Sequence, residues 1–415
     1  MGEFMMSAGA GKAEISLSGV LPHDGFDVQR HGLYARALLI EGEGERVCIL
    51  SLEVTSIAPD LLLRLREEVK DETGCDGSHA WVVPTHTFSA PHVRTPGHLA
   101  DDTERARNER YRSALLDAAR TALRQAVDSR RPVRLSAGEG SCPVNVSRDV
   151  ETPAGWWVGT NPQGYADHAM PVVVLNDARG EALAVLATAD VQSSVLDKSR
   201  DSEGKRVVSG DLFGFAAQTL ERERGCVALL LPGAAGDQAP SEKAVRTDFA
   251  ADGSSSTVDA HELAYRMLHK QGRTLAEALA KAMGACVPVE GGRVFARVLD
   301  VELPAQERAD FHSLAPRRCY EFVSAGLVST SIYLLRLGEM TLVGIQPEVA
   351  SAFGSAVRAA KPERVLLATL VNGGQKYLPA PGAYQKITYE AMNSGFAAGA
   401  HERLLTSIIA ALSAA

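Results

Sequence analysis

Val83-Pro-Thr-His-Thr-Phe-Ser-Ala-Pro91 is the stretch on which the fold prediction depends, and Leu231-Pro-Gly-Ala-Ala-Gly-Asp-Gln-Ala-Pro240 has the same character. Each stretch follows a short apolar run that is typical of a buried strand, and each then turns through small residues and proline. Ligands of open α/β sheets bind at the carboxyl ends of the strands. The two stretches therefore predict a polar site that contains His86 and Asp237.

The rest of the chain predicts a mixed α/β fold, with helices flanking a multi-stranded sheet. A regular helical repeat covers residues 103–127, and two apolar runs at 170–175 and 182–189 flank a turn that is typical of a hairpin. The strands read as near-continuous apolar runs, which indicates a sheet buried on both faces. Glu348 and Tyr377 also follow predicted strands, so they belong to the same class of strand-end residue as His86.

The predicted domain organisation is simple. Residues 1–12 have the character of a tag remnant without regular structure, and residues 13–415 form one large domain. A polar, Ser/Gly-rich stretch at 242–258 predicts a mobile loop between two sub-lobes, 13–241 and 259–415.

Composition restricts the classes of partner. The 415 residues are 45% hydrophobic and 23% charged, which is typical of a globular protein. A net charge of −8 argues against nucleic acid or an anionic membrane as the main partner. We find no apolar run of the roughly 18 residues that a membrane span needs, and no signal-peptide pattern. We therefore expect a cytoplasmic protein with free thiols, which acts on a small molecule.

The motifs and their order resemble the neutral/alkaline ceramidase family. The resemblance extends over about residues 30 to 400, and it implies the catalytic-domain fold of that family without its C-terminal immunoglobulin-like domain. The similar segments are Thr85-His-Thr-Phe-Ser-Ala-Pro91, Val208-Ser-Gly-Asp-Leu-Phe-Gly-Phe-Ala216, Gly233-Ala-Ala-Gly-Asp-Gln-Ala-Pro240, Gly344-Ile-Gln-Pro-Glu348, Tyr377-Leu-Pro379 and Tyr389-Glu390.

The resemblance implies a zinc site that cleaves an N-acyl amide. The implied ligands are His86, Glu348 and Tyr377, and Gln192 stands where the family has a second metal-binding histidine. Zinc prefers imidazole nitrogen, so the neutral amide oxygen of a glutamine is a weaker ligand. Asp190 lies two residues before Gln192 and would share its side of a strand, where it could complete the metal shell or act as a general base.

Two further departures affect the predicted pocket. Phe88 replaces the second histidine of the family's Thr-His-Thr-His motif, and Ala239 replaces the serine proposed as nucleophile. We therefore expect a reshaped pocket and a substrate other than ceramide. The predicted substrate-binding residues are Phe88, His92, Trp157 and Lys376, of which Lys376 would suit an anionic substrate.

These residues predict a metal-assisted hydrolase or acyl-transfer enzyme that acts on an amide or related C–N bond of a small soluble metabolite, such as a natural-product intermediate. A metal-bound water would attack, and Asp237 would orient its loop. One alternative is a metal-independent cyclase, lyase or isomerase that uses His86 and Asp190 as acid and base. Another is a non-catalytic binding protein on the same scaffold. The enzymatic hypotheses require that His86, Glu348 and Tyr377 share one cavity.

Overall fold

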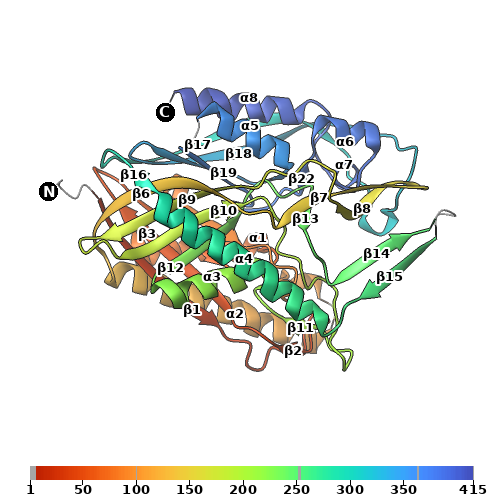
Figure 1. The fold of residues 1–415 in the computed structure, drawn as a ribbon, viewed down its shortest axis with the longest axis horizontal. Helices are drawn as coiled ribbons and strands as arrows, with labels where there is room; N and C mark the ends of the chain where they lie inside the picture. The colour runs from red at the N-terminus through yellow and green to blue at the C-terminus, as the bar shows by residue number, and fades with distance from the viewer. Residues whose placement is uncertain (1–5, 100, 251–253, 362–363, 415) are drawn as a thin grey trace.

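Two β-sheets lie face to face between two layers of helices in the computed structural model, which describes residues 6–99, 101–250, 254–361 and 364–414 (Figure 1). Within these residues the larger sheet has nine strands, ordered β12 (Val227–Pro232), β10 (Ala182–Ala189), β9 (Ala169–Asp177), β6 (Arg131–Ser141), β1 (Met6–Ile15), β3 (Leu33–Glu41), β4 (Arg46–Leu52) and β5 (Ala80–Pro84), with β16 (Val287–Pro288) paired to β6. The smaller sheet is ordered β17 (Val294–Gln306), β18 (Ser324–Leu337), β19 (Met340–Ile345) and β21 (Val365–Ala368).

Helices cover the outer face of each sheet. The larger sheet is covered by α1 (Pro59–Thr73), α2 (Asp102–Asp128), α3 (Asp211–Arg224) and α4 (Leu263–Ala285). The smaller sheet is covered by α5 (Ser351–Ala360) and α8 (Ala400–Ser413), and two short helices, α6 (Pro381–Lys386) and α7 (Tyr389–Met392), lie between them in the chain. The helix predicted at 103–127 is confirmed as α2. No helix in the described parts of the chain is long and apolar enough to cross a membrane.

The strands of the larger sheet bury side chains on both faces, as the sequence predicts. In β9, Val172 and Val174 pack against α3 and α4, whereas Val173 and Leu175 pack against the smaller sheet. Successive side chains of a strand point to opposite faces, so both faces must be apolar here. The predicted hairpin is also confirmed, because β9 and β10 pair antiparallel. The second sheet was not predicted, and it covers the face that we expected helices to cover.

The N-terminal prediction is wrong for residues 6–12. They form the first part of β1, which pairs with both β3 and β6 inside the larger sheet. A Cβ at Gly9 or Gly11 would lie 1.8 or 2.0 Å from a carbonyl oxygen of α2, so the small residues allow this helix to pack directly on the strand. Residues 1–5 lie outside the described part of the chain.

The predicted mobile loop at 242–258 contains a β-hairpin. Its strands are β14 (Val245–Phe249) and β15 (Ser255–Asp259), which pair antiparallel with Thr247 opposite Thr257. The hairpin projects from one end of the molecule (Figure 1). The prediction is therefore wrong for the paired residues, and residues 251–253 lie outside the described part. The strands contain the β-branched residues Val245, Thr247, Thr257 and Val258, whose β-propensity was outweighed in the sequence by the surrounding polar residues.

Small sheets near the ends of the large ones carry much of the candidate site. One contains β13 (Gln238–Pro240), β7 (Asn145–Thr152) and β8 (Gly155–Asn161). Another joins β20 (Glu348–Val349) to β22 (Tyr377–Leu378), and a third joins β2 (Val28–Gln29) to β11 (Val207–Val208).

Candidate functional site

The ends of strands from both large sheets converge on one buried cluster. His86 follows β5, Gln192 follows β10, and Glu348 follows β19. Glu348 lies directly opposite Tyr377 in the parallel pairing of β20 with β22. The structure therefore brings together His86, Gln192, Glu348 and Tyr377, which lie far apart in the sequence. Glu348 itself lies in the short strand β20, just before α5.

His86 and Glu348 form a buried acid–base pair. The Nε2 atom of His86 lies 3.2 Å from Glu348 Oε2, in the range of an ion pair but without the alignment of a hydrogen bond. On the other side of the ring, Nδ1 lies 2.5 Å from the carbonyl oxygen of Thr55. Since a carbonyl only accepts, Nδ1 carries a proton, and Nε2 is the atom that can exchange one with Glu348.

Gln192 fixes the charge of Glu348. Its Nε2 donates one hydrogen bond to the carbonyl of Ala235, at 3.0 Å, and another to Glu348 Oε2, at 2.8 Å. Because the Ala235 carbonyl cannot donate, this contact determines which end of the amide is the nitrogen. Burial opposes ionisation of Glu348, but the charge and close contact of His86 and the hydrogen bond from Gln192 lower its pKa from 4.5 to about 2. Glu348 is therefore a carboxylate at neutral pH.

The donor set does not fit the predicted zinc ion. A zinc ligand must offer a lone pair, yet Gln192 presents an N–H to the Glu348 oxygen that also faces His86, and its own Oε1 is buried without a hydrogen-bond partner among the described residues. Burial raises the pKa of Tyr377, with a further contribution from Glu348, so the phenol keeps its proton. No group of three histidine, cysteine or acidic side chains suited to a metal occurs among the residues described. The predicted ligands therefore meet in space, and Gln192 directs its N–H, not its oxygen, at Glu348.

Arg148 adds a permanent positive charge that the sequence analysis missed. It lies on β7, where its Nε donates to Glu390 Oε1 at 2.6 Å and its guanidinium lies 4.9 Å from the ring centroid of Tyr377. Its second terminal nitrogen, Nη2, is buried and has no hydrogen-bond partner among the described residues. The available signal was an adjacent pair of opposite charges, Arg148-Asp149, inside a strand-like stretch. Buried charges of this kind are found mainly where they are paired or used.

Asp149 and Asp237 supply carboxyl groups with raised pKa values. Both line a cavity of about 20 Å³, which also borders Glu348, Tyr377 and Glu390 and has room for one water molecule. Burial raises the pKa of Asp149, and the neighbouring Glu390 raises it further. Burial also raises the pKa of Asp237 from 3.8 to about 6, although hydrogen bonds from Gln238 and Ser351 oppose the change.

No family model and no curated protein matches this sequence. Two solved structures are nevertheless similar over the whole chain. Neutral ceramidase from Pseudomonas aeruginosa superimposes with a TM-score of 0.74 and 17% identity, covering 100% of this chain and 75% of that one. A structure described as ceramidase complexed with C2 gives a TM-score of 0.74 and 16% identity, covering 99% of this chain and 75% of that one. The chain has the fold of a neutral ceramidase.

In this ceramidase fold, Asp190 supports the structure and does not face His86. Strand β10 ends at Ala189, so the alternation that predicted a common side for Asp190 and Gln192 stops before it. Asp190 accepts a hydrogen bond from the backbone of Ala234 at 2.7 Å and pairs with Arg358 at 3.0 Å. The predicted roles of Asp190 as metal ligand or general base are therefore not supported by its position.

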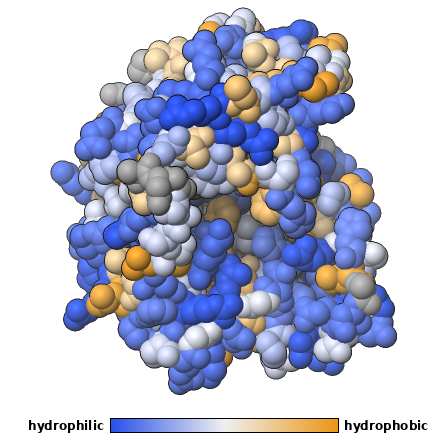
Figure 2. All heavy atoms as spheres, turned by 90° about the vertical axis from the view of Figure 1, so that its right-hand side faces the viewer, coloured by the Kyte–Doolittle hydropathy of each residue, from blue (hydrophilic) through white to orange (hydrophobic). Residues whose placement is uncertain are grey.

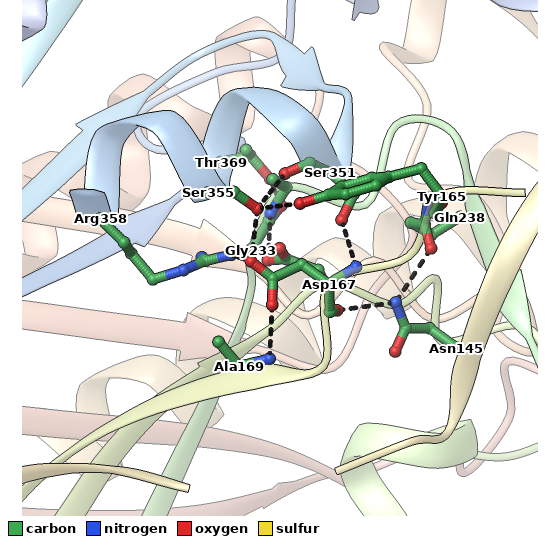
Figure 3. Close-up of polar contacts among 12 residues, drawn as sticks. Asn145, Tyr165, Asp167, Ala169, Gly233, Gln238, Ser351, Ser355, Arg358 and Thr369 are labelled. Atoms are coloured by element: carbon green, nitrogen blue, oxygen red, sulfur yellow. Dashed lines mark hydrogen bonds and ion pairs between the residues drawn. The ribbon is translucent and has the colours of Figure 1, made fainter. Parts of the chain in front are cut away.

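A polar network around Arg358 fixes the loops behind the candidate site. Arg358 extends from α5 toward Asp167, at 2.6 Å, and Ser355 contacts both Asp167 and Tyr165 (Figure 3). In the same view Asn145 donates to Gln238, at 2.9 Å. These contacts tie α5 to the segment before β9 and to the loop that carries Asp237. Asp237 accepts from the backbone N–H of Ser351, at 2.8 Å, which agrees with the loop-orienting role expected from the sequence.

Two of the four predicted substrate-binding residues border the site. The ring of Phe88 lies 4.8 Å from that of His86, and Trp157 lies 5.5 Å from Tyr389, which in turn contacts Tyr377. His92 is instead held in a surface network, 2.6 Å from Asp24. The Lys376 side chain is exposed, whereas its backbone carbonyl accepts a hydrogen bond from Glu348 N–H at 2.8 Å, so Lys376 positions β20 through its backbone.

Proposed function

We propose that this protein is an amide hydrolase or acyl-transfer enzyme that uses buried acid–base groups. The observation that carries the proposal is the pair of carboxyl groups, Glu348 and Asp149, in one cavity with pKa values shifted in opposite directions. The lowered pKa keeps Glu348 as a carboxylate on the basic side of the site, and the raised pKa keeps Asp149 protonated as the acid. The ceramidase fold supports amide chemistry as the reaction class.

His86 and Glu348 form the basic half of the site. They take a proton from a water molecule, whose oxygen forms a new bond to the amide carbon. Because Nδ1 of His86 is held by the Thr55 carbonyl, the proton arrives at Nε2, where the Glu348 carboxylate stabilises the imidazolium. Ala239 occupies the position at which the resemblance implies a serine, so water is the nucleophile.

Arg148 and Asp149 form the electrophilic half. The unpartnered Nη2 of Arg148 stabilises the negative charge that develops on the carbonyl oxygen in the tetrahedral intermediate. The protonated Asp149 donates its proton to the nitrogen as the C–N bond breaks, and the proton that His86 took from water then passes to the Asp149 carboxylate, which restores both groups. The products are a carboxylate and an amine, and no step requires a bound zinc ion.

One specific observation favours a second candidate, a metal-independent cyclase, lyase or isomerase. The N–H of Gln192 donates to Glu348 Oε2, so this oxygen is held in a hydrogen-bonded pair of proton-transfer groups with His86 beside it. Proton transfer between two positioned groups is sufficient for such reactions without an attacking water. Incorporation of ¹⁸O from labelled water into a product carboxylate distinguishes hydrolysis from this candidate.

The proposal is tested with a panel of small N-acyl amides, followed by mass spectrometry of the products. We expect Glu348→Gln and Arg148→Ala each to lose at least ~100-fold in kcat, because they remove the carboxylate that stabilises the His86 imidazolium and the oxyanion donor. The matched control is Lys281→Ala on the exposed face of α4, which should retain wild-type turnover. Retention of activity in both site variants, with intact circular dichroism, would refute the proposal.

A further inference from the structure

We propose that a pocket lined by Trp157, Lys198 and Lys243 binds an anionic group of the substrate. We call it the cationic pocket. The inference rests on the proposed function and extends it by naming the substrate class, an amide that carries a carboxylate or phosphate at a distance from the scissile bond.

The cationic pocket is a hollow formed by three separate segments. It has a volume of about 200 Å³ and is lined by β8, by the turn at Asp197 and Lys198, and by the β14–β15 hairpin with Lys243 just before it. Figure 2 views the end of the molecule where β8 and this hairpin lie, and the surface is hollowed near its centre. A volume of this size suits a compact polar group and is smaller than the roughly 300–1,000 Å³ of sites for whole drug-sized ligands.

Positive charge exceeds negative charge around the cationic pocket. The carboxylate of Asp197 lies 3.9 Å from Lys243 Nζ and also 3.9 Å from an Arg206 nitrogen, so one acid is shared by two cations at the edge of ion-pair range. Lys198 has no carboxylate partner in the portion of the chain described. Arg246 also lines the pocket, but its charge is already paired with Asp248.

Lys243 lies in an environment that disfavours its own charge. Its side chain is only 20% exposed, and burial lowers its pKa, with further lowering by the nearby charges of Arg148 and Lys198, while the carboxylates of Asp197 and Asp211 oppose the change. An anion in the pocket would relieve this repulsion and form charge-assisted hydrogen bonds with the ammonium group. Lys198 also holds a left-handed backbone conformation, with φ of 63°, which a lysine adopts only when the surroundings impose it.

The cationic pocket adjoins the acid–base cluster along two routes. On one side Arg206 donates to the carbonyl of Phe88, at 3.5 Å, and Phe88 contacts His86. On the other side Trp157 contacts Tyr389, whose ring lies 5.8 Å from that of Tyr377. A substrate anchored in the pocket would therefore extend between these aromatic side chains toward Arg148 and Glu348.

The experiment compares three matched amides that differ only in a terminal carboxylate, phosphate or neutral carboxamide. For Lys243→Met and Lys198→Met we expect KM of the preferred anionic amide to rise at least ~10-fold, with kcat changed less than ~3-fold. The neutral amide should show no change in KM. The matched control is Lys270→Met. It removes an exposed lysine of α4 that pairs with Glu242. Comparison of the carboxylate and phosphate amides identifies the preferred anion.

Failure of this inference is distinguishable from failure of the proposed function. If wild-type protein cleaves neutral and anionic amides equally, or if the lysine variants raise KM for both, the pocket does not bind the anion although the hydrolase proposal stands. If no amide is cleaved, fluorescence of Trp157 is titrated with inorganic phosphate and with glutarate. We then expect saturable binding that weakens at least ~10-fold in Lys243→Met. An absence of saturable binding to either anion would overturn the inference.

Discussion

The chemistry of the site depends on Gln192 more than on any other departure from the resemblance. Its amide nitrogen is bound by the Ala235 carbonyl, and so it offers an N–H, not a lone pair, to Glu348. A histidine at this position could offer a lone pair to a metal shared with His86 and Glu348. We therefore propose that this single residue favours a hydrogen-bonded acid–base site over a metal site.

Gln192→Ala and Gln192→His test this role directly. We expect Gln192→His to gain zinc to about one ion per chain, because a second imidazole joins His86 and Glu348 as a preferred ligand. Wild type and Gln192→Ala should hold about tenfold less zinc after dialysis, measured by plasma mass spectrometry. Stoichiometric zinc in the wild type would contradict the account.

The raised pKa of Asp237 predicts that the stability of the folded protein changes with pH. Its pKa is about 6 in the folded protein and 3.8 ordinarily, so the folded state binds the proton more tightly. The stabilisation from this proton is fully present below pH 3.8 and is lost as the pH rises through 6. Between pH 5 and 7, the free energy of unfolding of wild type should fall by roughly 1 kcal/mol relative to Asp237→Asn. Urea unfolding at both pH values measures this, and parallel behaviour of the two proteins would contradict it.

At the scale of elements, α5 links the candidate site to the core. Its first turn is held by Asp237 through Ser351, and its last turn by Arg358 through Asp190 and Asp167. The Asp190 and Arg358 side chains are 1% and 8% exposed, so their charges depend on each other. Loss of one partner leaves the other charge buried without compensation.

Arg358→Ala should therefore lower the free energy of unfolding by about 3–5 kcal/mol. The matched control is Arg364→Ala, which breaks an exposed pair with Glu339 and should cost less than about 1 kcal/mol. Adding Asp190→Asn to Arg358→Ala should restore part of the loss, because it removes the unpaired charge. Denaturant unfolding measures the free energy of unfolding of wild type, Arg358→Ala, Arg364→Ala and the double variant. Equal losses in the two single arginine variants would show that Asp190 does not depend on Arg358.

The sequence predicts elements well where apolar periodicity is strong, and poorly where polar composition conceals it. The helix α2 and the β9–β10 hairpin follow from regular spacing, whereas β14 and β15 lie in a Ser/Gly-rich stretch. Within the site, His86 and Glu348 are predicted by their positions after apolar runs. Arg148 was missed because it lies in the middle of a short strand, and its burial depends on residues about 200–240 positions away, Tyr377 and Glu390.

At the scale of the whole molecule, the site exists because two sheets pack face to face. The strand ends after β5, β10 and β12 belong to the larger sheet, and those after β19 and β21 to the smaller one. One shared apolar core joins the facing sides of the two sheets. Residues that are separated by more than 250 positions, such as His86 and Glu348, are thereby brought within 3.2 Å. The chain has the fold of a neutral ceramidase, and Gln192 donates to Glu348 beside His86 where the two sheets meet.

The most direct test of this arrangement measures bound zinc and amide turnover in the same samples of purified protein. We predict that wild-type protein stripped to about a tenth of an ion per chain turns over at the same rate as protein incubated with zinc, and that Glu348→Gln reduces either rate at least ~100-fold. Turnover that rises in proportion to bound zinc, or that survives Glu348→Gln, would contradict the claim that the buried His86–Glu348 pair carries the chemistry.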